Sequence, residues 1–219
     1  MIGGEGSLSR HGTVIDLNTG NECPSSLGQL SSEDLYAPAI GIVEDKFIMV
    51  CGGFQLSGSS RNDKTECEVI DGKSKNDKIA IDANRFANAI QWSNSALWLT
   101  GHKDNKSTII VTRKGYFAGP DLPDVRYGHC GLRINVTTAI IISGSIKQEP
   151  FDGLVYSELS GQSTKSSWYF DFPTQTWIEG PAFEHSRPRL GQFSCAMFTL
   201  DEKPQIVLVN GKHNYYQNG

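Results

Sequence analysis

Short apolar runs that each end in a glycine turn recur along this chain at a nearly constant interval. The runs read MIGG, FIMVCGG, ALWLTGH, AIIISGS and IVLVNGK, and the first two end in the paired glycines Gly3-Gly4 and Gly52-Gly53. The ends of successive runs lie roughly 49, 49, 43 and 67 residues apart, and the last value falls to roughly 47 if 146–165 is an insertion. A fixed interval of this length predicts one supersecondary unit repeated along the chain.

Each repeat has further apolar segments around its glycine run. In the second repeat, YAPAIGIV precedes FIMVC, and TECEVID and KIAID follow it. Such segments are short, rich in β-branched and aromatic residues and separated by polar turns, and none has convincing helical periodicity. Each repeat is therefore predicted to be a meander of four antiparallel strands, here called a, b, c and d in chain order. We expect one all-β domain over 1–219, with repeat units at roughly 1–35, 36–84, 85–125, 126–188 (with the insertion 146–165) and, in part, 189–219.

Finer motifs repeat in phase with these units. An aromatic residue of strand d precedes Gly-Pro in TWIEGP and YFAGP, and an arginine follows each of these glycines by about seven residues, at Arg126 and Arg187. With the paired glycines and the interval near 50 residues, the chain resembles the kelch-repeat family, although His102 and Ser145 replace the second glycine in two runs. The resemblance implies a kelch-type β-propeller of four-stranded antiparallel blades, with about four blades' worth of strands in this chain.

Kelch propellers usually close with more blades than this, so the resemblance leaves two arrangements open. Either the sequence is a fragment of a longer protein, which we favour, or its last a and b strands pair with its first c and d strands in a small ring. Two unpaired end strands would otherwise leave open sheet edges, which promote aggregation.

The repeated glycines and aromatics have a structural role in this interpretation. Glycine tolerates positive φ and lets neighbouring strands approach closely, and these runs lack the pattern and the following helix of a phosphate-binding loop. The aromatics Tyr116, Trp168 and Trp177 are expected to pack between blades, with stacking on a sugar or a base as the alternative. The structural glycines are Gly3, Gly4, Gly52, Gly53, Gly101, Gly144 and Gly211.

Composition narrows the class of protein. Hydrophobic residues make up 38% and charged residues 20%, which is typical of a globular protein. The net charge is -4 with acids and bases interspersed, so nucleic acid is not an expected partner. No apolar run approaches the roughly 18 residues of a membrane span, so membrane insertion is not expected either.

The five cysteines are scattered. An odd, widely spaced set argues against a disulfide framework and against zinc, so we expect free, mostly buried thiols, with a bridge between Cys51 and Cys67 as the alternative. N-glycosylation acceptor patterns occur at Asn105 and Asn135, and they matter only if the chain is secreted. The compartment stays undetermined, with an intracellular location slightly favoured.

No catalytic or metal-binding constellation is predicted. The sequence has no GxSxG elbow and no paired histidines of a zinc site, although His102 and His185 share one end of the predicted strands. Cys130 follows His129 directly, and adjacent residues of a strand point to opposite faces, so the histidine is not placed to activate the thiol. We predict no catalytic residues, no metal and no cofactor.

The loops at one end of the predicted strands are the expected binding surface. In an antiparallel meander, the b–c and d–a connections lie at one end and the a–b and c–d turns at the other. The a–b turns are short, whereas the b–c and d–a loops are long and varied, as binding loops on a rigid scaffold usually are. Arginines and aromatics of these loops are the candidate partner contacts, with backbone bracing between blades as the alternative for Arg126, Arg187 and Arg189. The candidates are Arg61, Arg85, Arg126, Phe151, Tyr156, His185, Arg187 and Arg189.

The expected function is therefore non-catalytic binding of another protein or peptide. Kelch adaptors of ubiquitin ligases hold acidic peptides with arginines and aromatics of such loops, and the resemblance implies a similar use of this end. Two alternatives stay open: an extracellular adhesion or glycan-binding module, and a carbohydrate-active kelch enzyme similar to galactose oxidase or to the sialic-acid epimerase-like proteins. The copper-oxidase version requires a Tyr–Cys crosslink and a site of two histidines and two tyrosines, which these residues do not assemble.

Overall fold

The computed structural model describes residues 35–36, 38–57, 60–70, 77–81, 88–101, 105–126, 128–146, 162–182, 193–200 and 203–210. Every regular element in these ranges is a β-strand, and all paired strands are antiparallel. The chain divides into two compact units, Met1–Leu99 with Ile109–Gly119, and Thr100–Thr108 with Pro120–Gly219.

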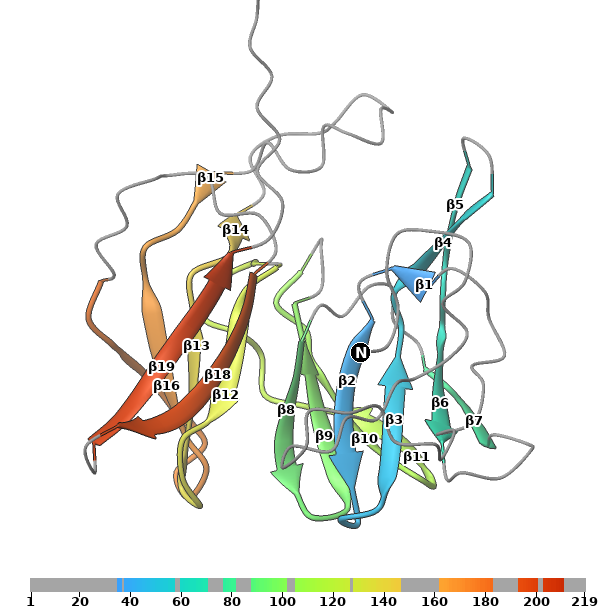
Figure 1. Ribbon diagram of the computed structural model, residues 1–219, viewed down its shortest axis with the longest axis horizontal. Coiled ribbons are helices and arrows are strands. Elements are labelled where there is room, and N and C mark those ends of the chain that lie inside the picture. Colours follow the sequence, from blue (N-terminus) through green and yellow to red (C-terminus); the bar gives the residue numbers. More distant parts are fainter. Residues whose placement is uncertain are drawn as a thin grey trace, which may run out of the picture. The chain divides into compact units, whose positions relative to one another are not determined.

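Unit 1 contains two four-stranded meanders (Figure 1). The first has the order β2-β3-β6-β7, from Ala39–Val43, Phe47–Cys51, Glu66–Ile70 and Asp77–Ala80. The second has the order β11-β10-β9-β8, from Gly115–Ala118, Ile109–Thr112, Ala96–Thr100 and Asn88–Ser93. A smaller sheet of order β1-β4-β5, from Leu35–Tyr36, Phe54–Ser57 and Ser60–Asp63, extends the b–c connection of the first meander.

The two meanders of unit 1 pack face to face over one hydrophobic core. Strands β3, β6, β9 and β10 are almost wholly buried, as expected for inner strands that are covered on both faces. The core takes Met49 and Val69 from the first meander and Leu97 and Val111 from the second. Gly41 of β2 permits this approach, because a Cβ there would lie 2.6 Å from Cδ2 of Leu97.

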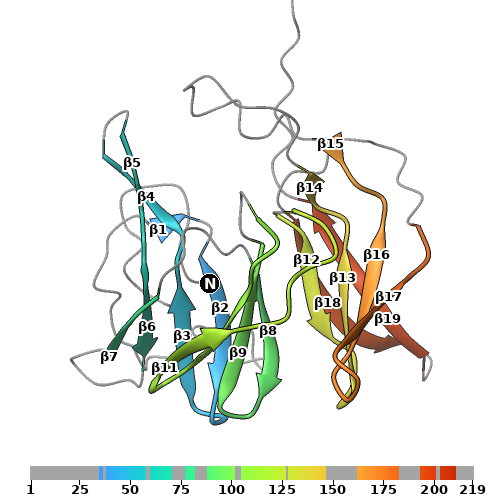
Figure 2. The same cartoon turned by 180° about the vertical axis from the view of Figure 1, so that it is seen from behind.

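Unit 2 contains a third four-stranded meander and a two-stranded sheet (Figure 2). The meander has the order β12-β13-β16-β17, from Cys130–Arg133, Thr138–Ile142, Ser167–Asp171 and Thr176–Glu179. The two-stranded sheet pairs β18, Phe193–Leu200, with β19, Lys203–Asn210. Its side chains Ile206 and Leu208 pack with Ile140 and Ile142 of the meander in a second core. A short pair, β14 (Ser145–Ile146) and β15 (Gln162–Ser163), extends the b–c connection.

The prediction of an all-β chain built from four-stranded antiparallel meanders is confirmed for the described residues. The predicted a, b, c and d strands of repeats 36–84, 85–125 and 126–188 correspond to the three meanders, and the a and b strands of 189–219 correspond to β18 and β19. The first predicted unit, 1–35, lies almost entirely outside the described residues.

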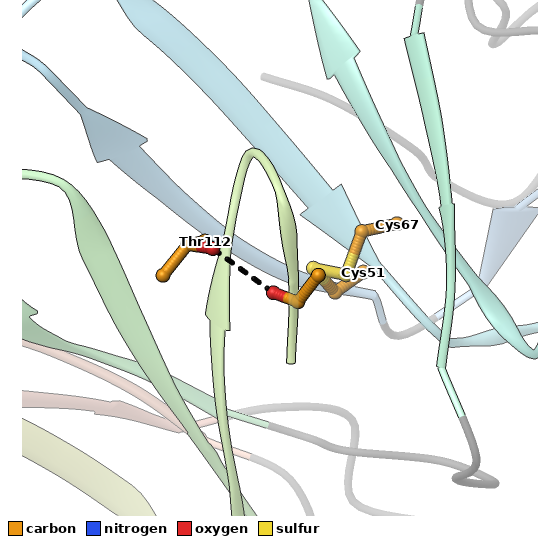
Figure 3. The surroundings of a disulfide bond; sticks show 4 residues. Cys51, Cys67 and Thr112 are labelled. Atoms are coloured by element: carbon orange, nitrogen blue, oxygen red, sulfur yellow. Dashed lines mark hydrogen bonds between the residues drawn. A yellow bond between two sulfur atoms is a disulfide. The ribbon is translucent and has the colours of Figure 1, made fainter. Parts of the chain in front are cut away.

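The expectation of free thiols is wrong for four of the five cysteines. Cys51 and Cys67 are bridged, because they are direct cross-strand partners of β3 and β6 with Cα atoms 4.0 Å apart (Figure 3). Cys130 and Cys195 are bridged as well, with Cα atoms 5.8 Å apart. The second bridge joins β12 to β18 across a sequence separation of 65, a distance at which spacing alone carries no signal. Cys23 lies outside the described residues.

Candidate partner-binding end

In each unit, the turns and the long connections lie at opposite ends of the sheets. The a–b turns at 44–46, 94–95 and 135–137 and the c–d turns at 113–114 and 172–175 are tight. The b–c connections are longer, and in each unit one of them forms extra strands: β4 and β5 in unit 1, and β14 and β15 in unit 2. Within each unit, Figure 1 shows these extra strands at the end away from the tight turns. We call this end of each unit the loop end.

The loop end of unit 1 is a β-hairpin fixed at its base. Gly52 N donates to the carbonyl of Glu66 (3.0 Å), and Lys64 N donates to the carbonyl of Gly53 (3.0 Å). The φ values of these glycines are 62° for Gly52 and 83° for Gly53, in the left-handed region that glycine enters at little cost. The candidate contact Arg61 lies on this hairpin, on β5 opposite Leu56.

The loop end of unit 2 begins with a similar tie between strands b and c. Ser143 N donates to the carbonyl of Ser166 (3.0 Å), the Ser143 hydroxyl donates to the carbonyl of Thr164 (2.8 Å), and Thr164 N donates to the carbonyl of Gly144 (2.9 Å). Gly144 has φ 103°, and Gly101 after β9 has φ 94°. The predicted insertion 146–165 therefore leaves the sheet through a hydrogen-bonded neck, β14 with β15.

Arg126 connects the d–a loop of unit 2 to this neck. Its side chain is fully buried, and it donates through Nε and Nη2 to both carboxylate oxygens of Asp124. The guanidinium also donates to the carbonyl of Ser143 (3.1 Å) and to the hydroxyl of Ser166 (2.9 Å). These contacts are those of a brace within unit 2, and we no longer propose the buried guanidinium of Arg126 as a partner contact.

His129 lies beside this brace and is kept neutral. The imidazole is buried, with Nε2 2.8 Å from the hydroxyl oxygen of Thr100. Burial, and then repulsion from Arg126, lower the pKa of His129 from 6.5 to about 3, while Asp124 and the backbone of Arg126 act in the opposite direction. A histidine of this pKa is a weak base, and Thr100 is fully buried, so the pair is not arranged as a base with an accessible nucleophile.

A buried hydroxyl holds the proline of the Gly-Pro motif after strand d in two repeats. The Thr108 hydroxyl donates to the carbonyl of Pro120 (2.9 Å), and the Ser167 hydroxyl donates to the carbonyl of Pro181 (2.7 Å). Each hydroxyl residue stands at the start of strand c of the repeat that the proline ends. Neither hydroxyl was predicted from the sequence, because it precedes its proline by 12 residues in one repeat and by 14 in the other, so spacing alone does not mark the pair.

The three repeat aromatics have different surroundings. Trp177 packs against Phe170, with ring centroids 4.9 Å apart, and its Nε1 donates to the carbonyl of Asp121 (2.8 Å). Trp168 is half-buried on β16. Tyr116 is 41% exposed on β11, so a packing role fits Trp177 better than Tyr116.

Six of the eight candidate contacts lie outside the described residues. They are Arg85, Phe151, Tyr156, His185, Arg187 and Arg189, and the same holds for Gly3, Gly4 and Gly211. Within the described ranges, no group of three His, Cys, Asp or Glu side chains could hold a metal ion. The same ranges contain no helix of the length and apolar character needed to cross a membrane.

Comparison with known proteins gives a likeness of fold alone. No protein-family model and no curated protein sequence matches the chain. Among solved structures, 130 chains are similar. One, described as "Structure of YjhT", superposes with a TM-score of 0.67 at 10% sequence identity, over 88% of this chain and 64% of that chain. The chain therefore spans less than two thirds of the length of this neighbour.

Proposed function

We propose that this chain is a kelch-type β-propeller module that binds another protein or peptide through its loop ends. The observation that carries the proposal is the asymmetry between the two ends of the meanders. The a–b and c–d turns are tight, whereas a b–c connection of each unit is extended by added strands, β4 with β5 and β14 with β15. Varied loops on a rigid scaffold are the usual place of a binding site.

The brace around Arg126 supports this division between frame and contact surface. Its guanidinium ties the d–a loop to both sides of the b–c neck, so the bases of these two loops are held together. A fixed base reduces the conformational entropy lost when a loop orders against a partner. We assign partner contact to the outer loop residues Arg61, Arg85, Phe151, Tyr156, His185, Arg187 and Arg189.

The arginines among these residues favour an acidic partner. Arginine has a planar guanidinium, which forms paired hydrogen bonds with a carboxylate more readily than lysine does, and Arg61, Arg187 and Arg189 are all of this residue type. We therefore expect the partner segment to carry Asp or Glu and its binding to weaken as salt concentration rises.

Alanine variants of both ends test this proposal. The dissociation constant of a captured partner is measured for Arg61→Ala, Arg187→Ala and Arg189→Ala, with Lys46→Ala and Lys114→Ala at exposed tight turns as controls. We expect at least one loop-end variant to lose about tenfold or more in affinity, while the controls bind as the unchanged chain does. Loss of binding in the controls alone would overturn the proposal.

The two disulfides favour a second candidate, an extracellular adhesion or glycan-binding module. Disulfides persist in oxidising compartments and are rare in the cytosol, so this bonding pattern suits a protein of the cell exterior. Binding of the purified chain to an array of immobilised glycans tests this candidate. Saturable binding that a soluble sugar competes away would support it, and an array without signal would count against it.

A further inference from the structure

Two exposed turns of unit 2 hold N-glycosylation acceptor sequences in the same local conformation. Asn105, Lys106 and Ser107 form one acceptor triplet, and all three residues are exposed. The side-chain oxygen of Asn105 accepts a hydrogen bond from the backbone N–H of Ser107 (2.9 Å). The triplet stands in the b–c connection between β9 and β10.

The second triplet repeats this arrangement and adds a contact. Asn135, Val136 and Thr137 form the a–b turn between β12 and β13, and all three are exposed. The side-chain oxygen of Asn135 accepts from the backbone N–H of Thr137 (2.8 Å) and from its hydroxyl (2.9 Å). Val136, at the tip, is 80% exposed, so within the described structure a large group on this turn meets no covering side chain.

The cysteines supply an independent observation that points to the same processing. Cys51, Cys67 and Cys130 are buried, and two bridges are formed, one within unit 1 and one within unit 2. Such bridges form where thiols are oxidised, which in eukaryotic cells is the compartment in which N-glycans are attached. Each bridge forms when two thiols pass two electrons and two protons to the disulfide of an oxidoreductase, which leaves as a dithiol.

From these observations we propose that the chain matures in an oxidising secretory compartment and carries N-linked glycans on Asn105 and Asn135. In the transfer, Nδ2 of the asparagine forms a bond to the anomeric carbon of an oligosaccharide carried on a lipid diphosphate. The bond from that carbon to the diphosphate oxygen breaks, and the lipid diphosphate leaves with the electron pair. One amide proton passes to a base of the transferase.

The two positions have different consequences for the loop ends. Asn135 stands in a tight turn, so its glycan covers the end that the proposed function leaves without a partner. Asn105 stands in a b–c connection, so its glycan borders the loop end of unit 2. The glycosylation proposal depends on neither binding candidate, since it rests on the acceptor turns and the disulfides alone.

The test uses the full chain secreted from eukaryotic cells, and the protein isolated from its natural source. Treatment with an amidase that removes N-glycans should increase gel mobility and convert Asn105 and Asn135 to aspartate, as read by peptide mass spectrometry. Asn105→Gln, Asn135→Gln and Thr137→Ala should each remove one glycan, whereas Thr137→Ser should keep both because the hydroxyl is retained. Asn94→Gln is the matched control, since Asn94 is exposed in a turn but Ala96 stands where the acceptor hydroxyl would be.

The state of the cysteines is read in the same samples by alkylation before and after reduction. We expect Cys51, Cys67, Cys130 and Cys195 to resist alkylation until a reductant is added. A secreted, disulfide-bonded chain with both asparagines unmodified would overturn the glycosylation proposal. Free thiols and unmodified asparagines in the natural protein would overturn the whole inference. The amidase treatment of the unchanged chain shows whether Asn105 and Asn135 carry N-glycans, even if one variant fails to fold.

Discussion

Replacing Arg126 by methionine is expected to destabilise unit 2 without altering any residue proposed to touch a partner. The guanidinium is buried and bonded to Asp124, to the carbonyl of Ser143 (3.1 Å) and to the hydroxyl of Ser166 (2.9 Å). Methionine is of roughly similar length but donates no hydrogen bond. A carboxylate and a carbonyl would therefore lose their partner together.

The size of the loss follows from the burial of the two charges. Removing one member of a buried ion pair costs about 3–5 kcal/mol. The side chain of Asp124 is 32% exposed, so water recovers part of its hydrogen bonding, and we expect the lower end, about 3 kcal/mol. A chain of this length loses about 2–4 °C in Tm for each kcal/mol, which gives a fall of about 6–12 °C.

Thermal and urea unfolding, followed by far-ultraviolet circular dichroism, measure this loss. Arg133→Met is the matched control, because Arg133 donates to the backbone carbonyls of Asn135 and Val136 at an exposed turn. We expect the control to lose less than about 1 kcal/mol. The double variant Asp124→Leu with Arg126→Met should lose less than the sum of its single changes, since it leaves no buried charge unpaired.

The binding assay separates bracing from direct contact. If Arg126 is a brace, Arg126→Met lowers Tm, and the fraction that remains folded binds the partner with close to unchanged affinity. An Arg126→Met chain with the Tm of the unchanged protein and no affinity for the partner would refute this reasoning, because the guanidinium would then act at the contact itself.

Three further predictions concern packing, pH and the first disulfide. Gly41→Ala should lower the free energy of urea unfolding by about 1–3 kcal/mol, because the new Cβ would lie 2.6 Å from Leu97 Cδ2. If the losses from Gly41→Ala and Leu97→Ala simply add in the double variant, the clash with Leu97 is not their cause. The pKa of His129 is 6.5 in the unfolded chain and about 3 in the folded chain, so this group does not reduce the free energy of unfolding above pH 6.5. Between pH 6.5 and about pH 3 the unfolded chain binds a proton that the folded chain does not, and the free energy of unfolding falls by up to about 1.4 kcal/mol per pH unit. His129→Gln should flatten this slope, and an unchanged slope would assign the pH dependence to other groups. Replacing Cys51 and Cys67 together by alanine should lower the free energy of unfolding, measured without reductant, by about 3 kcal/mol. No decrease would mean that the two thiols of the unchanged chain are already reduced.

The strands could be predicted because the chain repeats the same local signals. In the three meanders, the b strand is a mostly buried apolar run followed by a glycine of positive φ, as at Gly52 (62°), Gly101 (94°) and Gly144 (103°), and the next strands follow at similar offsets. Where the secondary structure of one segment is ambiguous by itself, the segments at the same position in the other repeats indicate a strand.

Contacts between repeats left weaker signals in the sequence. Cys130 and Cys195 are brought together by the packing of β12 with β18, which depends on the arrangement of whole sheets. The brace of Arg126 depends on Asp124 two residues earlier and on Ser166 forty residues later, and a loop arginine could equally have faced solvent. Burial decided that choice, and burial is set by tertiary packing.

Site-specific photocrosslinking at both ends of the sheets tests the central claim most directly. A photoreactive residue is placed at exposed loop-end positions, Asn62 and Lys165, and at exposed tight-turn positions, Lys46 and Thr174. Binding through the loop ends predicts partner adducts from Asn62 or Lys165 and none from Lys46 or Thr174. Adducts confined to Lys46 and Thr174, with none from the loop ends, would contradict it.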